Sequence, residues 1–175
     1  MPQYVRAYVP GGAYFFTVAL LERRGRLLTE NIEALREALR SVRDRRPFRI
    51  DAIVILPDHL HCIWTLPPND ADFSTRWRLI KSSFARAVAP GERLSIRRQM
   101  KHERGVWQRR FWEHAIRDQG DYDAHLDYIH FNPVKHGWVP RVAEWPHSSF
   151  HRFVRLGLYQ PEWAAPADIR EWDLE

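Results

Sequence analysis

The sequence contains a single cysteine, Cys62, among its 175 residues. One thiol excludes both an intramolecular disulfide and a cysteine-rich zinc module, so nothing ties the chain to an oxidising compartment. No stretch is long and apolar enough to span a membrane, and residues 1–10 lack the basic and apolar regions of a secretion signal. Internal repeats, low-complexity tracts and interdomain linkers are also absent. These absences predict a cytoplasmic protein that has no membrane partner.

Positive charge is in excess over negative charge. The chain has 27 Lys and Arg against 22 Asp and Glu, which gives a net charge of +5, and most of the basic residues are arginine. Arginine binds phosphate through parallel hydrogen bonds and stacks on bases, which favours nucleic acid as the partner. A solvated arginine-rich surface without a partner is the alternative. With 45% hydrophobic residues, the chain can bury the core of one domain.

Hydrophobic patterning predicts the order strand, helix, hairpin, helix, strand. The expected elements are a strand at 13–20, a helix from a Thr29 cap to before Pro47, strands at 48–56 and 60–66 joined at Pro57-Asp58, a helix at 73–88 and a strand at 110–117. This order is typical of an α+β fold, in which a ferredoxin-like or RRM-like antiparallel sheet carries helices on one face.

Two basic segments are candidates for contact with nucleic acid. One is the polar face of the expected helix at 73–88, and the other is the segment 97–110, where basic residues alternate with aromatic ones as in proteins that bind single strands. The candidate DNA-binding residues are Arg78, Lys81, Arg86, Arg97, Arg98, Lys101, Arg104, Arg109 and Arg110. A solvated face explains the helical part equally well. The helix dipole explains a further group in the first helix, which comprises Arg40, Arg43, Arg45 and Arg46.

Two histidines open the second strand of the expected hairpin. His59 and His61 are separated by one residue, so strand alternation points both rings to the same face. Nine histidines in this chain give about 0.5 such pairs by chance, so the motif is weak alone. Two hydrogen-bonded structural histidines are an equally good interpretation. The case for a metal site therefore depends on the rest of the chain.

A later segment supplies a nucleophile and an oxygen ligand. A helix from an Asp121 cap to about Asn132, ended by Pro133, places Tyr128 and Asn132 on one face. If this helix lies near the two histidines, Asn132 completes a mixed set of donors that suits Mg²⁺ or Mn²⁺. The metal would polarise a phosphodiester for attack by the phenol, which is a poor nucleophile at its usual pKa of about 10. Packing explains the nearby His125 and His130 better than a role as base.

Two other functions fit parts of the same pattern. A protein that binds nucleic acid without cleaving it would use the same basic and aromatic surface. A zinc hydrolase would combine His59 and His61 with a third histidine such as His147 or His151. The binding protein would form no metal-dependent covalent product, whereas the tyrosine enzyme would form one that requires Tyr128. The zinc hydrolase would carry zinc when purified.

Four segments carry a resemblance to a known family. The segment LPDHLHCIW resembles the two-histidine motif of HUH single-strand DNA transposases. The segment YIHFNPVKHGWV is similar to the signature of REP-associated tyrosine transposases, which are named for repetitive extragenic palindromes (REPs). These enzymes are relatives of the insertion-sequence 200-like transposases. The segments PGGAYFFTVAL and WQRRFWEHAIRD also look like this family. The resemblance covers about residues 4–155.

The resemblance implies a function and a set of site residues. It implies an HUH catalytic domain over 1–155, followed by a tail at 156–175 to which we assign no chemistry. It also implies a divalent metal held by His59, His61 and Asn132, and attack by Tyr128 to give a 5′-phosphotyrosine and a free 3′-OH. The expected substrates are single-stranded REP-like hairpins, and the expected location is the bacterial nucleoid. The insertion-sequence relatives usually have Gln where Asn132 stands. No dimer-forming strand or heptad stripe is present, which favours a monomer.

Overall fold

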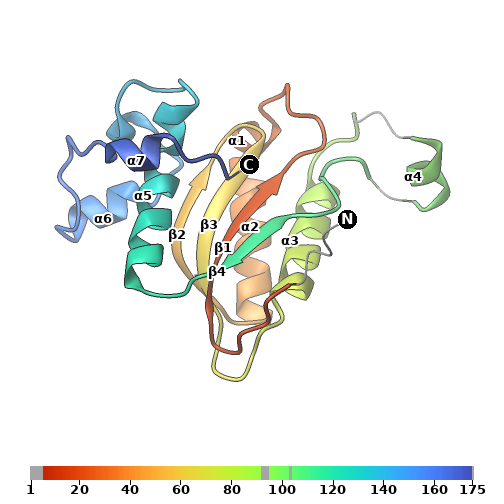
Figure 1. Ribbon diagram of the computed structural model, residues 1–175. Helices are drawn as coiled ribbons and strands as arrows, with labels where there is room; N and C mark the ends of the chain where they lie inside the picture. The colour runs from red at the N-terminus through yellow and green to blue at the C-terminus, as the bar shows by residue number, and fades with distance from the viewer. Residues whose placement is uncertain (1–5, 92–94, 103, 175) are drawn as a thin grey trace.

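The computed structural model describes residues 6–91, 95–102 and 104–174 (Figure 1). Its elements are β1 (Ala13–Ala19), α1 (Leu27–Glu30), α2 (Ile32–Arg45), β2 (Arg49–Ile55), β3 (His59–Thr65), α3 (Phe73–Ala87), α4 (Ile96–Met100), β4 (Trp112–Ala115), α5 (Gln119–Lys135), the 3₁₀ helix η1 (Val142–Glu144), α6 (Phe150–Arg155) and α7 (Ala167–Arg170). All four expected strands and the two expected sheet-packing helices are present.

The four strands form one antiparallel sheet in the order β2-β3-β1-β4. The two strands that are adjacent in sequence, β2 and β3, form the expected hairpin, and β1 lies between β3 and β4. This arrangement confirms the α+β fold with a ferredoxin-like order of strands. Thr17 on β1 is paired directly with His61 on β3, which fixes the surroundings of that histidine.

Helices cover both faces of the sheet, as Figure 1 shows. Helices α2 and α3 lie on one face, and α5 lies on the other. Strand β1 explains the two layers, because Tyr14, Phe16 and Val18 belong to the core under α2 and α3 whereas Phe15 belongs to the core under α5. A strand that is apolar on both faces requires cover on both. The expectation of helices on one face therefore accounts for α2 and α3 only.

The helix ends differ from the sequence prediction in three places. The hydroxyl of Thr29 donates to the carbonyl of Arg26 inside α1, so Thr29 does not begin the long helix, which starts after Asn31. Asp118, not Asp121, caps α5 by accepting from the backbone N–H of Asp121 at 2.9 Å. Helix α5 also continues through Pro133 to Lys135. Proline removes one backbone hydrogen bond, and near a helix end the loss is small enough to be tolerated.

Candidate active site

Hydrogen bonds to Asp58 orient His59 at the start of β3. Nδ1 of His59 lies 2.7 Å from a carboxylate oxygen of Asp58, and the other carboxylate oxygen accepts from Arg23 at 2.8 Å. Burial alone would raise the pKa of Asp58, but the hydrogen bonds from His59 and Arg23 lower it to about 2. Nδ1 also lies 3.2 Å from Nη2 of Arg23, which can only donate. The shorter contact with the ionised Asp58 favours N–H on Nδ1 and the lone pair of His59 on Nε2.

A threonine on the neighbouring strand, Thr17, orients His61 through its Nδ1 atom. The hydroxyl of Thr17 lies 2.9 Å from Nδ1 of His61 and donates to the carbonyl of Leu174 at 2.7 Å. Because its proton is directed to Leu174, this hydroxyl accepts from Nδ1–H of His61. The rings of His59 and His61 lie 4.9 Å apart and are almost fully buried. Both imidazoles are therefore fixed as the tautomer with its lone pair on Nε2.

Helix α5 places a tyrosine and an asparagine against these histidines. The ring of Tyr128 lies 5.3 Å from that of His61, and the ring of His136, two turns later, lies 5.1 Å from that of His59. Asn132 is midway between Tyr128 and His136 on the same helix face, so it faces the histidine pair. Among the described residues, neither side-chain atom of Asn132 has a hydrogen-bond partner, although both atoms are buried. Buried amides normally have partners, which marks Asn132 as a position suited to a ligand.

The donor set fits the divalent metal that the family implies. Two imidazole nitrogens and one amide oxygen form a mixed N and O set, which suits Mg²⁺ or Mn²⁺ with positions left for phosphate oxygens and water. Each histidine also has a hydrogen-bonded partner on Nδ1, the arrangement that usually orients metal-binding imidazoles. The buried amide of Asn132 would supply the third donor. These residues could hold such a metal.

The hydroxyl of Tyr128 lies against a lysine. Nζ of Lys135 is 3.3 Å from the Tyr128 oxygen and 5.1 Å from the centre of its ring. The Lys135 side chain is only 19% exposed, and its ammonium group also pairs with Asp173 at 3.6 Å. A cation so close to a phenol favours the ionised form of the oxygen. The arrangement therefore supports nucleophilic chemistry at Tyr128.

The last residues of the described chain cover the tyrosine. Tyr128 has 0% exposure, and the backbone N–H of Leu174 donates to its oxygen at 3.3 Å. The ring of Trp172 lies 6.2 Å from that of Tyr128 and 5.2 Å from that of His125. This contact is new, because no chemistry is expected of 156–175 from the sequence. Its aromatic residues were the signal that this segment packs on the domain, since isolated tails rarely keep several large apolar side chains.

The two other histidines of α5 have structural contacts. His130 is fully buried among Phe150, Phe153 and Tyr159, and burial together with the charge of Arg152 lowers its pKa to about 3. Its Nε2 lies 2.9 Å from the hydroxyl of Ser149. His130 is therefore a neutral core residue, in agreement with its interpretation from sequence.

His125 belongs to a cluster that sequence analysis did not find. Possible ligand atoms of His114, Asp121 and His125 lie within 4.8 Å of one another, the only such His, Cys, Asp or Glu group in the described part of the chain. Asp121 accepts from His114 at 2.8 Å and from Arg117 at 3.2 Å, and despite burial these hydrogen bonds hold its pKa well below its usual range. Burial lowers the pKa of His125. Hydrogen bonds from the histidines and the ion pair with Arg117 give Asp121 partners in this cluster.

A family model described as Transposase IS200 like matches residues 11–132. The chain belongs to the IS200-like transposase family. It is 51% identical to the REP-associated tyrosine transposase of Escherichia coli (strain K12) over 94% of this chain and 92% of that protein. A relative from Haemophilus influenzae is 44% identical over 97% of each chain. The fold is also similar to a solved structure of a REP-associated tyrosine transposase bound to a REP hairpin, with a TM-score of 0.82, 50% identity, and coverage of 95% of this chain and 93% of that chain.

Family membership identifies this transposase as an enzyme that cleaves and transfers DNA. It confirms the resemblance to REP-associated tyrosine transposases that the sequence motifs carry. The zinc hydrolase alternative finds no support, because neither His147 nor His151 takes part in a metal-type cluster among the described residues. Nε2 of His151 instead lies 2.7 Å from the carbonyl of Trp145. None of the helices that the structure describes is long and apolar enough to cross a membrane.

Most of the predicted DNA-binding residues of this transposase lie in one hollow. A cleft of about 880 Å³ beside α3, called the α3 cleft below, is lined by residues that include Arg78, Lys81, Arg86, Arg98, Arg104 and Arg109. The structure does not bring Arg97, Lys101 or Arg110 into this cleft. Arg104 also has a structural role, because its guanidinium donates to the carbonyl oxygens of Val88 at 2.9 Å and Ala89 at 3.1 Å at the end of α3.

Two features of the α3 cleft were not evident from the sequence. Arg6, far away in sequence, lines the cleft and stacks on Phe111, with its guanidinium carbon 4.4 Å from the ring centre. Burial, together with the charge of Arg6, lowers the pKa of Lys81 to about 8. Nζ of Lys81 donates to the carbonyl of Gln108 at 2.9 Å. Burial is the main cause of this lowered pKa, and the charge of Arg6 adds to it.

Proposed function

We propose that the protein cleaves and rejoins single-stranded DNA at REP-like hairpins, with Tyr128 as the nucleophile. One observation carries this proposal: the buried hydroxyl of Tyr128 lies beside Lys135 and next to the His59 and His61 pair. A solved relative that is 50% identical is bound to a REP hairpin, which supports the choice of substrate. DNA binding would also place the protein at the nucleoid in a bacterial cytoplasm.

The reaction conserves the energy of the phosphodiester. The oxygen of Tyr128 attacks phosphorus, an O–P bond to the tyrosine forms, and the bond from phosphorus to the 3′ oxygen breaks. The 3′ oxygen takes up a proton and the phenol loses one, so that the products are a 5′-phosphotyrosine and a free 3′-OH. A 3′-OH can reverse this step on another strand end, and strand transfer therefore needs no ATP.

The chain's own residues prepare this attack. Lys135 stabilises the phenolate of Tyr128 as the proton leaves, because an adjacent cation favours the charged form. Asp58 and Thr17 hold His59 and His61 in the tautomer that presents Nε2. A divalent metal such as Mg²⁺ or Mn²⁺, when bound by His59, His61 and Asn132, would polarise the scissile phosphate and neutralise charge on its oxygens.

The α3 cleft would hold the phosphate backbone of the hairpin. Its arginines and Phe111 combine charge with an aromatic surface, which suits nucleic acid. Arg97, Lys101 and Arg110, which lie outside the cleft, would extend the contact. We further propose that the protein acts as a monomer, since its nucleophile and its three proposed metal ligands all belong to one chain.

A protein that binds hairpins without cleaving them is the second candidate. The observation that favours it is the complete burial of Tyr128 beneath Leu174 and Trp172, because a nucleophile must reach its phosphate. Such a protein would retain hairpin binding and form no covalent product. The two candidates therefore differ in one measurable step.

The test is formation of a covalent protein–DNA adduct. The full chain is incubated with labelled single-stranded hairpin DNA, with Mg²⁺, Mn²⁺ or EDTA, and resolved on a denaturing protein gel. We expect a metal-dependent labelled band that Tyr128→Phe abolishes and that the matched control Tyr122→Phe, on the same helix, retains. Binding without a band in any metal, across hairpins from the host's own repeats, would instead support the non-cleaving protein.

A further inference from the structure

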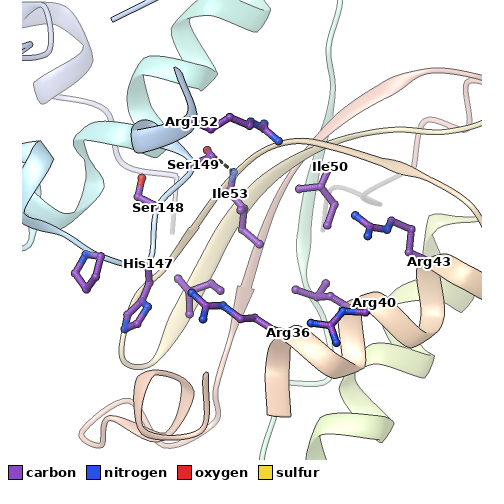
Figure 2. A pocket seen from close by; sticks show the side chains of 12 residues that line it. Arg36, Arg40, Arg43, Ile50, Ile53, His147, Ser148, Ser149 and Arg152 are labelled. Atoms are coloured by element: carbon purple, nitrogen blue, oxygen red, sulfur yellow. Dashed lines mark hydrogen bonds between the residues drawn. The ribbon is translucent and has the colours of Figure 1, made fainter. Parts of the chain in front are cut away.

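A second basic hollow lies at the β2 edge of the sheet, away from the α3 cleft. Three arginines of α2, Arg36, Arg40 and Arg43, line one side, while His147, Ser148 and Arg152 line the other (Figure 2). Ile50, Ile53 and Ile55 of β2 also line it, and the volume is about 360 Å³. We call it the β2-edge cleft. The helix dipole explains Arg40 and Arg43 when the sequence alone is considered, but it does not explain why they face a hollow with another arginine across it.

The wall opposite α2 is held rigidly by backbone hydrogen bonds. The N–H of Ile55 donates to the carbonyl of His147 at 2.9 Å, and the N–H of Ser149 donates to the carbonyl of Ile53 at 2.8 Å. The hydroxyl of Ser149 in turn accepts from the N–H of Ile53, as drawn in Figure 2. This wall lies outside residues 11–132, the part that matches the family model. This wall is therefore preformed, and it lies outside the segment that the family model matches.

The charges around the cleft do not cancel. Arg36 pairs with Glu33 at 2.6 Å and Arg40 pairs with Glu37 at 2.7 Å, and all four side chains are well exposed. Arg43 and Arg152 form no ion pair with any residue that the structure describes, and Arg152 donates to the carbonyl of Asp51. Two cations thus remain uncompensated in a concave site. Anions are attracted to such a site more strongly than to a flat surface.

The spacing of the arginines favours a run of phosphates over a single one. Positions 36, 40 and 43 follow one face of α2 and span about 10 Å along the helix at 1.5 Å per residue. This span is longer than one phosphate group, so the three arginines can contact successive phosphates of one strand. Arginine forks bind phosphate oxygens in pairs, and the hydroxyl of Ser148, which accepts from the N–H of Phe150, keeps its proton for donation.

The sheet register places the β2-edge cleft close to the histidine pair. Val54 is paired with His61 on one side and with Ser148 on the other. Adjacent strands are about 4.8 Å apart, so the backbone of Ser148 is about 10 Å from that of His61. The cleft lies on the face of the sheet opposite to Tyr128. A strand that leaves the Tyr128 site and passes around the segment 147–149 would therefore reach the cleft.

We propose that the β2-edge cleft binds the phosphate backbone of the single strand that flanks the hairpin, as a second DNA contact separate from the α3 cleft. This inference rests on the proposed function only in its choice of DNA. It assigns a phosphate-binding role to Arg36, Arg43 and Arg152, with Arg40 and Ser148 beside them. The cleft would hold the flanking strand at the β2 edge, on the face of the sheet opposite to Tyr128. Holding the strand there would fix its path through the active site.

The test measures binding in EDTA, so that cleavage does not interfere. Fluorescence anisotropy compares a hairpin with ten-nucleotide thymidine extensions and the same hairpin without them, over a range of salt concentrations. We expect Arg36→Gln/Arg43→Gln to weaken binding of the extended hairpin roughly tenfold, and to reduce the slope of log K against log salt by about 1.4, or 0.7 for each lost contact. Binding of the hairpin without extensions should change little.

The matched control is Arg45→Gln/Arg155→Gln, which removes the same charge from α2 and α6 outside the cleft. Equal affinities and slopes for the two double variants would overturn the inference. An equal loss on both hairpins would assign the cleft to the stem and overturn the flanking-strand assignment. A third outcome is that inorganic phosphate stabilises the wild type but not the Arg36→Gln/Arg43→Gln variant, while the two proteins bind DNA equally well. This result would show that the cleft binds free phosphate only and would overturn the DNA assignment.

Two further measurements keep the result unambiguous. Circular dichroism and thermal melting establish that each variant folds, and Arg43→Gln alone, at an exposed position without an ion pair among the described residues, tests the cleft if the double variant unfolds. A wild-type chain that binds neither hairpin would refute the proposed function itself. A wild type that binds both, with cleft variants that bind like the control, would refute only this inference.

Discussion

The side-chain oxygen of Thr17 lies 2.9 Å from Nδ1 of His61 on the neighbouring strand. The two residues face each other in the register of β1 and β3, so the contact is fixed by the sheet and not by a flexible loop. Asp58 has the corresponding position beside His59. Each proposed histidine ligand therefore has its own orienting partner, and the two partners can be removed separately.

Replacing Thr17 by valine should weaken metal binding. Valine keeps the shape of threonine but leaves Nδ1–H of His61 buried without its acceptor, and loss of such a partner typically costs 10- to 100-fold in metal affinity. The same change should destabilise the fold by roughly 1–3 kcal/mol. Calorimetric titration with Mn²⁺ measures the affinity, and Thr75→Val on α3 is the control. An unchanged affinity for Mn²⁺ in a folded Thr17→Val protein would show that His61 is not a ligand.

Lys135 should act on the rate of cleavage and not on DNA binding. Its ammonium group lies 3.3 Å from the oxygen of Tyr128 and stabilises negative charge there. We expect Lys135→Met to slow formation of the covalent adduct about tenfold or more, as loss of one stabilising donor at a reacting oxygen does elsewhere. Lys135→Arg, which keeps the charge, should recover part of the rate.

Single-turnover adduct kinetics measure this effect, and anisotropy measures hairpin affinity in parallel. Arg155→Met, which removes an exposed cation outside the active site and outside both clefts, is the control. A Lys135→Met protein with the normal adduct rate would exclude a role for the cation. A parallel loss of affinity and rate would assign Lys135 to DNA binding.

Hairpin binding should weaken between pH 7 and pH 9 because of Lys81. Burial and the charge of Arg6 lower the pKa of Lys81 to about 8, so this lysine is charged below pH 8 and neutral above it. A phosphate prefers the charged form, and affinity therefore falls as pH rises through this range. Lys81→Arg stays charged and should give a flat profile over the same pH range. Parallel profiles for the two proteins would show that Lys81 does not contact the DNA.

Local patterns predicted the parts of the site that lie within single elements. Alternation placed His59 and His61 on one face, and helical spacing placed Tyr128 and Asn132 together, because each relation depends on a few neighbouring residues. The meeting of these two elements came from the family resemblance. Nothing in the periodicity of the chain specifies that α5 crosses the second face of the sheet.

Contacts between distant residues were beyond the sequence. Thr17 could not be assigned as the partner of His61 before the register of the sheet was known. The wall of the β2-edge cleft pairs with β2 from about 90 residues away, and such pairing leaves no local signal. The continuation of α5 through Pro133 was missed for a different reason, since the tertiary packing of this helix outweighs the local preference before proline.

The end of the chain should restrain the reaction at Tyr128. Leu174 donates to the Tyr128 oxygen and accepts from Thr17, and Trp172 packs on the rings of Tyr128 and His125. The tyrosine is fully buried in this arrangement, so a phosphate reaches it only when these residues move away. The rate of cleavage then depends on the fraction of molecules in which the tail is open.

Ending the chain after Glu171 should therefore accelerate adduct formation. If the tail is open in about one molecule in ten, its removal raises the rate about tenfold while hairpin affinity changes little. Trp172→Ala should give a smaller increase, and Glu171→Ala, at the adjacent exposed position, should give none. Adduct kinetics with the hairpin in saturating amounts and Mn²⁺ measure the effect, and thermal melting establishes that each variant folds. A truncated, folded protein that reacts at the rate of the full chain would show that the tail opens freely and does not limit access to Tyr128.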